Sequence, residues 1–158
     1  MNVFNHFLTS FIVLYMFFID NNSITEIIGF SFVFGVLLDL NQIIGRYLGR
    51  PIHHTRTWVE EPFGLILVGF SLGVLLSLIK KDYFFMVVIP YGIHIILDYL
   101  TIHEVSPLSP FSNKNIKTGF FKSTPSKVWY TGTEKGLSES YFLVSNIFLM
   151  IILLFPFF

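Results

Sequence analysis

Long apolar runs alternate along this chain with polar connections of two very different lengths. Apolar residues dominate five segments, at about residues 3–19, 24–40, 62–79, 83–100 and 141–158. Each segment is close to or slightly under the roughly 20 residues that a helix needs to cross about 30 Å of hydrocarbon. The pattern therefore predicts an all-α polytopic membrane protein of about five transmembrane helices, with residues 1–158 forming a single membrane-embedded domain.

The connections between these segments predict the orientation of the helices. Residues 21–23 and 80–82 are short enough for tight turns, whereas the loops 41–61 and 101–140 are long and polar. Antiparallel crossing then places both long loops and the amino terminus on one face. That face holds eight basic residues, Arg46, Arg50, Arg56, Lys114, Lys117, Lys122, Lys127 and Lys135, against Lys80 and Lys81 on the other. The positive-inside rule predicts a multi-pass protein of the cell (inner or plasma) membrane with its long loops in the cytoplasm.

The amino-acid composition supports a membrane protein and argues against a nucleic-acid-binding protein or a disulfide-stabilised one. Hydrophobic residues make up 53% of the 158 residues and charged residues only 13%, against roughly 25% charged in an average soluble domain. Ten basic and ten acidic residues give a formal net charge of zero, so no overall charge indicates a nucleic-acid partner. Cysteine is absent, which excludes disulfides and thiolate metal sites.

One apolar segment carries an imidazole and a carboxylate at helical spacing. Within IPYGIHIILDYLT, His94 and Asp98 are four residues apart, so a helix places both side chains on one face, one turn apart. An ionisable residue inside a membrane span indicates a functional site by default. The alternative is a hydrogen-bonded His–Asp pair that only holds two helices together.

The expected topology brings further metal-ligating residue types to the same face. All five histidines fall there, together with acidic residues at the ends of the spans: the candidate metal ligands are His6, Asp39, His53, His54, His94, Asp98 and His103. Imidazole and carboxylate without cysteine suit a catalytic divalent metal, zinc first, with manganese or iron as alternatives. Of His53 and His54, we expect one to bind the metal and the other to be solvated or to support it.

The order of these motifs resembles the membrane-bound metal-dependent hydrolase family, which includes LexA-binding hydrolases of the bacterial inner membrane and archaeal relatives. The resemblance rests on His6 near the start of the first span, Asp39 in LLDLN, the histidine-containing loop before the third span, and GIHIILDYLT followed by SPLSPF. It covers nearly the whole chain. The family is more distantly similar to zinc-dependent phospholipase C and related nucleases, which implies a site of more than one metal that His103 could join.

This chain departs from the family pattern at several positions. Asn41 stands where the family has a second aspartate, and Leu38 replaces a proline. The family's second loop histidine is absent: depending on the alignment, Trp58 or Glu60 takes its place. Glutamate can bind a metal and tryptophan cannot.

Together these observations predict a metal-dependent hydrolase, a phosphoesterase acting on a phosphate ester or lipid at the cytoplasmic face of the membrane. Glu60 or Glu61 is the expected general base, although both precede Pro62, where an acidic residue also favours the start of a helix. Arg56 is the expected partner of the phosphate, because guanidinium matches its geometry. The alternative is a non-enzymatic metal-binding protein, either a transporter component or a regulator that docks a soluble partner; the sequence indicates no oligomeric state.

The basic-residue bias gives a direct test of topology. Since the chain has no cysteine, single cysteines can report which side of the membrane a loop occupies. Asn113→Cys should be protected from an impermeant thiol reagent in intact cells, whereas Lys81→Cys should react. The opposite labelling pattern would reverse the cytoplasmic assignment of the long loops.

Overall fold

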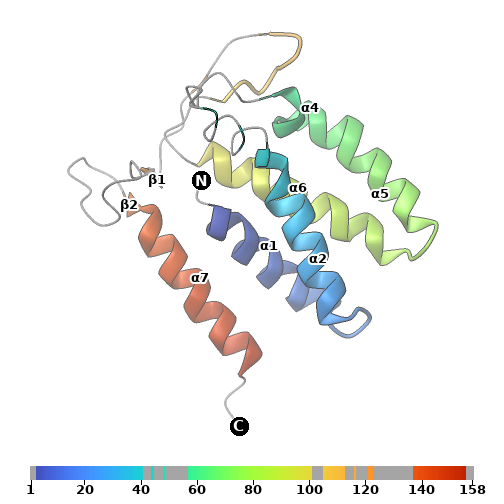
Figure 1. The fold of residues 1–158 in the computed structure, drawn as a ribbon, viewed down its shortest axis with the longest axis vertical. Helices are drawn as coiled ribbons and strands as arrows, with labels where there is room; N and C mark the ends of the chain where they lie inside the picture. The colour runs from blue at the N-terminus through green and yellow to red at the C-terminus, as the bar shows by residue number, and fades with distance from the viewer. Residues whose placement is uncertain are drawn as a thin grey trace.

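Most of the backbone that the computed structural model describes is helical; the described residues are 3–40, 44, 48, 57–100, 105–112, 116, 121–122 and 137–155 (Figure 1). The main helices are α1 (Val3–Phe18), α2 (Ile24–Gly35), α5 (Phe70–Ser77), α6 (Asp82–Tyr99) and α7 (Glu139–Leu154). The expected all-α class is confirmed, and each of the five expected segments contains a helix.

Short elements connect these helices at the end of the bundle that holds the amino terminus. They are the 3₁₀ turns η1 (Leu37–Asp39) and η3 (Trp58–Glu60), the single turn α4 (Pro62–Gly64), and the π-helical η4 (Leu65–Gly69) that runs directly into α5. Two short strands, β1 (Phe121–Lys122) and β2 (Leu137–Ser138), pair in parallel with Phe121 opposite Leu137. Because η1 and η3 lie against each other, they bring the chain segments on either side of the loop 41–61 together.

The length of the helices is near the limit for crossing a membrane. Within the described part of the chain, only α6, with 18 residues, is long and apolar enough to span a bilayer. The apolar helices Val3–Phe18, Pro62–Ser77 and Ser140–Leu154 are shorter.

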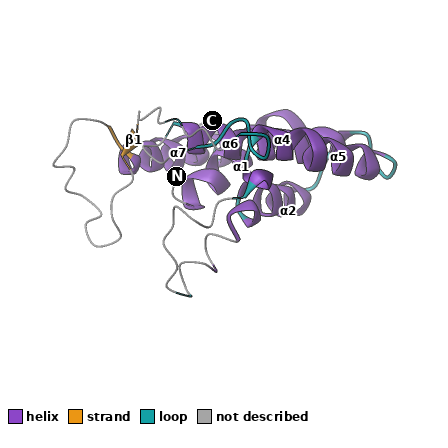
Figure 2. Cartoon of the chain, turned by 90° about the horizontal axis from the view of Figure 1, so that it is seen from above, coloured by secondary structure: helices purple, strands orange, loops and turns teal. Residues whose placement is uncertain are grey.

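Helices α1, α2 and α6 pack against one another at the centre, while α5 packs on α6 and α7 packs on α1. Figure 2 shows α5 and α7 at opposite flanks of this arrangement. The centre is apolar, with Phe11, Leu14, Ile27 and Met86 buried together. At Gly73, a Cβ atom would lie 3.0 Å from the Phe84 ring and 3.2 Å from the Phe84 carbonyl oxygen, so the absence of a side chain lets α5 and α6 approach closely.

Polar contacts tie the two short turns together at the end of the bundle away from the amino terminus. Ser23 caps α2 through a reciprocal pair of bonds with Glu26, as expected for a capping box. Across the turns, Tyr83 donates its hydroxyl to Glu26, and Asn22 Nδ2 donates to Asp82 Oδ2 at 3.2 Å. Lys80 Nζ donates to a backbone carbonyl of the α1–α2 turn at 2.6 Å. We call these contacts the turn clasp; they join the α1–α2 hairpin to the α5–α6 hairpin.

Tyr83→Phe should lower the free energy of unfolding measurably, because it removes the hydrogen bond from the Tyr83 hydroxyl to the charged Glu26. Tyr141→Phe is the matched control, since Tyr141 is well exposed on α7. Denaturant titration of both variants in detergent, followed by circular dichroism, measures the difference. Equal midpoints for the two variants would show that the turn clasp contributes nothing measurable.

Candidate metal centre

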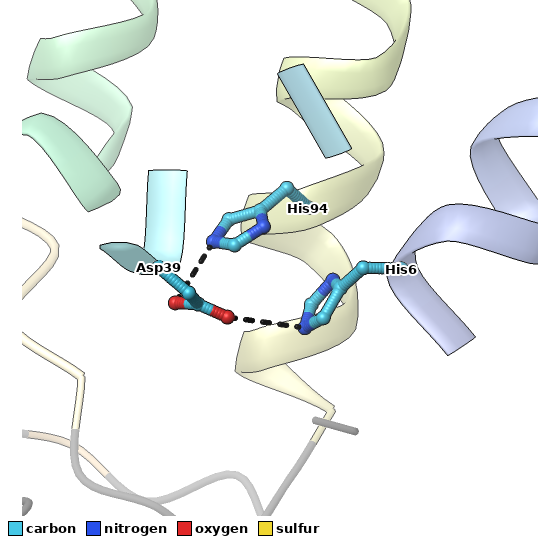
Figure 3. Close-up of side chains that lie close together, drawn as sticks. All are labelled: His6, Asp39 and His94. Atoms are coloured by element: carbon cyan, nitrogen blue, oxygen red, sulfur yellow. Dashed lines mark ion pairs between the residues drawn. The ribbon is translucent and has the colours of Figure 1, made fainter. Parts of the chain in front are cut away.

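Two helices and one 3₁₀ turn bring four of the expected ligands together at one end of the bundle. His6 lies in the first turn of α1, Asp39 ends η1 just after α2, and His94 and Asp98 lie in the last two turns of α6. The sequence separates these positions by up to 92 residues, yet all four side chains are buried. Figure 3 shows His6, Asp39 and His94 pointing toward one another.

The distances within this group match those around a single bound cation. One ligand atom each of His6, Asp39 and His94 lies within 4.8 Å of the others. His94 Nε2 is 3.5 Å from Asp39 Oδ1, and His6 Nε2 is 3.9 Å from Asp39 Oδ2. Tetrahedral zinc with bonds of about 2.0–2.1 Å separates its ligand atoms by roughly 3.3 Å. A small adjustment of side chains would therefore complete such a site.

Asp98 lies beside this group and contacts both histidines, although the described ligand atoms within 4.8 Å of one another are those of His6, Asp39 and His94. Its Oδ1 lies 3.0 Å from His6 Nε2 and its Oδ2 lies 3.7 Å from His94 Nε2. The two imidazole rings stack, with centroids 4.3 Å apart, so both rings present an edge to the same two carboxylates. The group thus offers two nitrogen and up to four oxygen donors, a set that suits zinc, manganese or iron.

The backbone of α2 fixes which nitrogen of His94 faces the carboxylates. His94 Nδ1 lies 3.0 Å from the carbonyl oxygen of Gly35, and a carbonyl can only accept, so Nδ1 carries the proton. In the neutral ring, Nε2 then has its lone pair directed at the group. Such a hydrogen bond on the far nitrogen is how proteins usually orient a metal-binding histidine.

The ring nitrogens that face the carboxylates lack hydrogen bonds of good geometry. Among the described residues, the Nε2 atoms of His6 and His94 are buried and make no hydrogen bond of acceptable angle, although Asp98 Oδ1 lies 3.0 Å from His6 Nε2. A buried polar atom without a partner costs roughly 1–3 kcal/mol. A cation between the nitrogens and the carboxylates would satisfy both sets of atoms. The residues present therefore fit a divalent metal ion.

Gly35 is a site residue that no pattern in the sequence selects. A Cβ atom there would lie 2.8 Å from Ser10 Oγ and 3.3 Å from the His6 carbonyl oxygen. The missing side chain lets α1 approach α2 next to His6, while the Gly35 carbonyl orients His94. A glycine can occur in an apolar helix for many structural reasons. The close approach of α1 and the hydrogen bond to His94 become visible only once the three helices are packed together.

Glu60 and Glu61, the expected catalytic carboxylates, are both buried but belong to a neighbouring set of contacts. Glu61 accepts hydrogen bonds from the Tyr99 hydroxyl at 2.8 Å and from the Ser106 N–H at 2.9 Å. Glu60 accepts from the Thr57 hydroxyl at 3.4 Å. Neither belongs to the described cluster of metal-ligating atoms.

The remaining residues that the sequence analysis proposed for the site lie outside the described residues: His53, His54, Arg56 and His103.

Replacing a ligand should lower the amount of bound metal. We expect His94→Ala and Asp98→Ala each to reduce the metal content of purified protein, because each removes a donor that the remaining residues cannot replace. Ser31→Ala is the control, since Ser31 is a buried polar residue of α2 whose described hydrogen bond runs from its hydroxyl to the Ile27 carbonyl of the same helix. Elemental analysis gives the metal per chain. Full occupancy in both ligand variants would leave a His–Asp hydrogen-bond network as the explanation.

The comparisons with known proteins add no family to this picture. No protein-family model, curated protein or solved structure matches the chain. The assignment of a function therefore depends on the chemistry of His6, Asp39, His94 and Asp98.

Proposed function

We propose that this chain is a polytopic membrane protein that acts as a metal-dependent hydrolase on a phosphate ester at the cytoplasmic face of the membrane. The observation that carries the proposal is the buried group of two histidines and two aspartates, with His94 oriented by the Gly35 carbonyl. Zinc is the metal that this donor set fits best, with manganese and iron as alternatives.

The surface of the helices supports the membrane part of the proposal. Every main helix exposes large apolar side chains, including Phe17 on α1, Phe32 on α2, Leu75 on α5, Phe85 on α6 and Phe148 on α7. Soluble proteins rarely leave such extensive apolar surface uncovered. Helices of 16 residues are about 24 Å long, so the proposed spans require a bilayer that thins locally to match them.

Each residue of the group has a definite part in the proposed reaction. A divalent cation in such a site lowers the pKa of water that it binds and neutralises charge on phosphoryl oxygens. Asp39 and Asp98 would supply the negative charge that holds the cation, and His6 and His94 would supply neutral nitrogen donors. Burial keeps bulk water from competing, so these electrostatic interactions act at low dielectric.

Of the two expected bases, Glu60 is the better candidate for proton transfer. Glu61 uses one oxygen for Tyr99 and the other for Ser106, which suits an anchoring role. Glu60 ends η3, the turn that lies against the turn carrying Asp39. We therefore assign the role of proton acceptor to Glu60. Glu61 has a structural role, in which it holds the chain segment that follows α6.

A second candidate function follows from the degree of burial. Both histidines have no exposed surface and the two aspartates have 6% and 3%. A site closed to this extent favours a protein that holds a metal without turnover, such as a regulator or a transporter component. A transporter would instead place its ionisable residues near mid-membrane, whereas these lie at one end of the bundle.

Glu60→Gln separates the two functions. If Glu60 accepts the proton, the variant should keep its metal and fold yet lose roughly 10²–10⁴-fold in hydrolysis. The assay uses metal-loaded protein in bilayers with a phosphomonoester, a phosphodiester and a phospholipid as probes, together with elemental analysis. Absence of hydrolysis of all three by the loaded wild-type protein would leave the metal-binding function in place of the enzyme.

A further inference from the structure

We propose that an uncharged loop beside the metal centre inserts into the lipid headgroup region and sets the depth of the site in the bilayer. The contacting surface consists of Trp58, Phe63, Leu108 and Phe111, which we call the loop cluster. Its occupant is the membrane surface itself. This inference rests on the membrane embedding in the proposed function, and it goes beyond that function by assigning a second surface.

The loop tip presents apolar side chains outward from a folded backbone. Leu108 is 60% exposed and Phe111 is 78% exposed. The tip nevertheless closes on itself, with the N–H groups of Phe111 and Ser112 donating to the Leu108 carbonyl at 2.8 and 3.0 Å. Satisfied backbone groups matter here, because an open loop with unpaired N–H groups would be costly to bring near lipid. The stretch VSPLSPFS contains no charged residue, which further lowers the cost of insertion.

The base of the loop is fixed to the protein on two sides. Val105 is fully buried and pairs with Ile116 through two backbone hydrogen bonds of 3.0 and 2.9 Å. The next residue, Ser106, donates its N–H to Glu61. Since Glu61 also accepts from Tyr99, the neighbour of Asp98, the loop and the metal centre share one anchor at the end of α6. The exposed tip is therefore held at a fixed height relative to the site.

Aromatic contacts connect the loop tip to the apolar surface of the neighbouring helix. The Phe111 ring meets the Phe63 ring edge-on at 5.0 Å, and Phe63 meets Trp58 edge-on at 5.9 Å. Beyond Phe63, the same helical run exposes Ile66 and Phe70. The loop cluster thus continues the surface that the proposed function places against lipid.

The composition of the loop cluster fits the boundary between headgroups and acyl chains. Tryptophan and other aromatic residues concentrate at membrane–water interfaces, where an apolar ring and a polar neighbourhood are both satisfied. Ser106 and Ser112 flank the apolar tip, and the buried polar metal centre lies at the same end of the helices. A lipid surface matches this gradient of polarity better than a uniformly apolar partner would.

Depth-dependent fluorescence quenching tests the insertion. The full chain is reconstituted in phosphatidylcholine vesicles that carry bromine either high on the acyl chains or near the terminal methyl groups. A background with Trp58→Phe and Trp129→Phe removes both tryptophans of the chain. Phe111→Trp in this background reports on the loop tip, and Phe70→Trp reports on the helix surface. We expect bromine high on the chains to reduce the Phe111→Trp emission more, and deep bromine to reduce the Phe70→Trp emission more.

The pair of reporters distinguishes failure of this inference from failure of the membrane proposal. Quenching of Phe70→Trp without quenching of Phe111→Trp would overturn loop insertion while leaving the membrane span in place. Added iodide then identifies what covers the tip: quenching means water, and protection means a protein surface. Absence of quenching at both reporters would overturn the membrane embedding and the loop insertion together. A repeat with Trp58 as the single tryptophan, in Trp129→Phe alone, must agree with the Phe111→Trp result if the loop cluster acts as one surface.

Discussion

Two imidazoles and two carboxylates meet, buried, at one end of a helix bundle, and their mutual electrostatics constrain the residues around them. A buried carboxylate is costly unless it is paired, and here Asp39 and Asp98 face ring nitrogens whose orientation the Gly35 carbonyl helps to fix. Something positive must lie between these groups, either protons or a metal ion. The donor set and the spacing of its atoms favour the metal. A metal ion bound there would link the ends of α1, α2 and α6.

The four candidate ligands come from two helical hairpins that are joined at both ends. At one end, His6 and Asp39 of the first hairpin meet His94 and Asp98 of the second. At the other end, the turn clasp joins the same hairpins through Glu26 and Tyr83, and an apolar core fills the space between. Attachment at both ends limits how far the hairpins can slide, which holds the ligands close to binding geometry before a cation arrives.

Glu61 links the metal centre to the proposed membrane-facing loop. Its two oxygens accept from Tyr99, which follows a ligand on α6, and from Ser106, at the base of the loop. A buried carboxylate in this position costs free energy unless its acceptor sites are used, and here each oxygen has a donor. The same contact would keep the site at headgroup depth, where a phosphate ester attached to a lipid presents its phosphate.

The sequence alone determined the helical class and selected the candidate ligands that the structure brings together. Apolar runs bounded by polar turns locate the helices because burial or lipid contact must cover a continuous apolar face. Helices α1, α2 and α5 fall within the expected segments, and α6 and α7 begin one and two residues before theirs. The i, i+4 spacing of His94 and Asp98 fixes their common face through local geometry. The alternating direction of successive helices predicts that His6 and Asp39 lie at the same end of the bundle as this pair.

Only the tertiary structure decided how these residues contact one another and which neighbours support them. The carbonyl of Gly35 orients His94. No pattern of side chains in the sequence can predict this contact, because it joins a side chain to a backbone carbonyl 59 residues away on another helix. Glu60 and Glu61 are adjacent in sequence and chemically alike, yet Glu61 bonds to Tyr99 and Ser106 while Glu60 bonds to Thr57. That difference arises because a 3₁₀ turn followed by Pro62 directs the two side chains toward different partners, and such directions are set by packing rather than by composition.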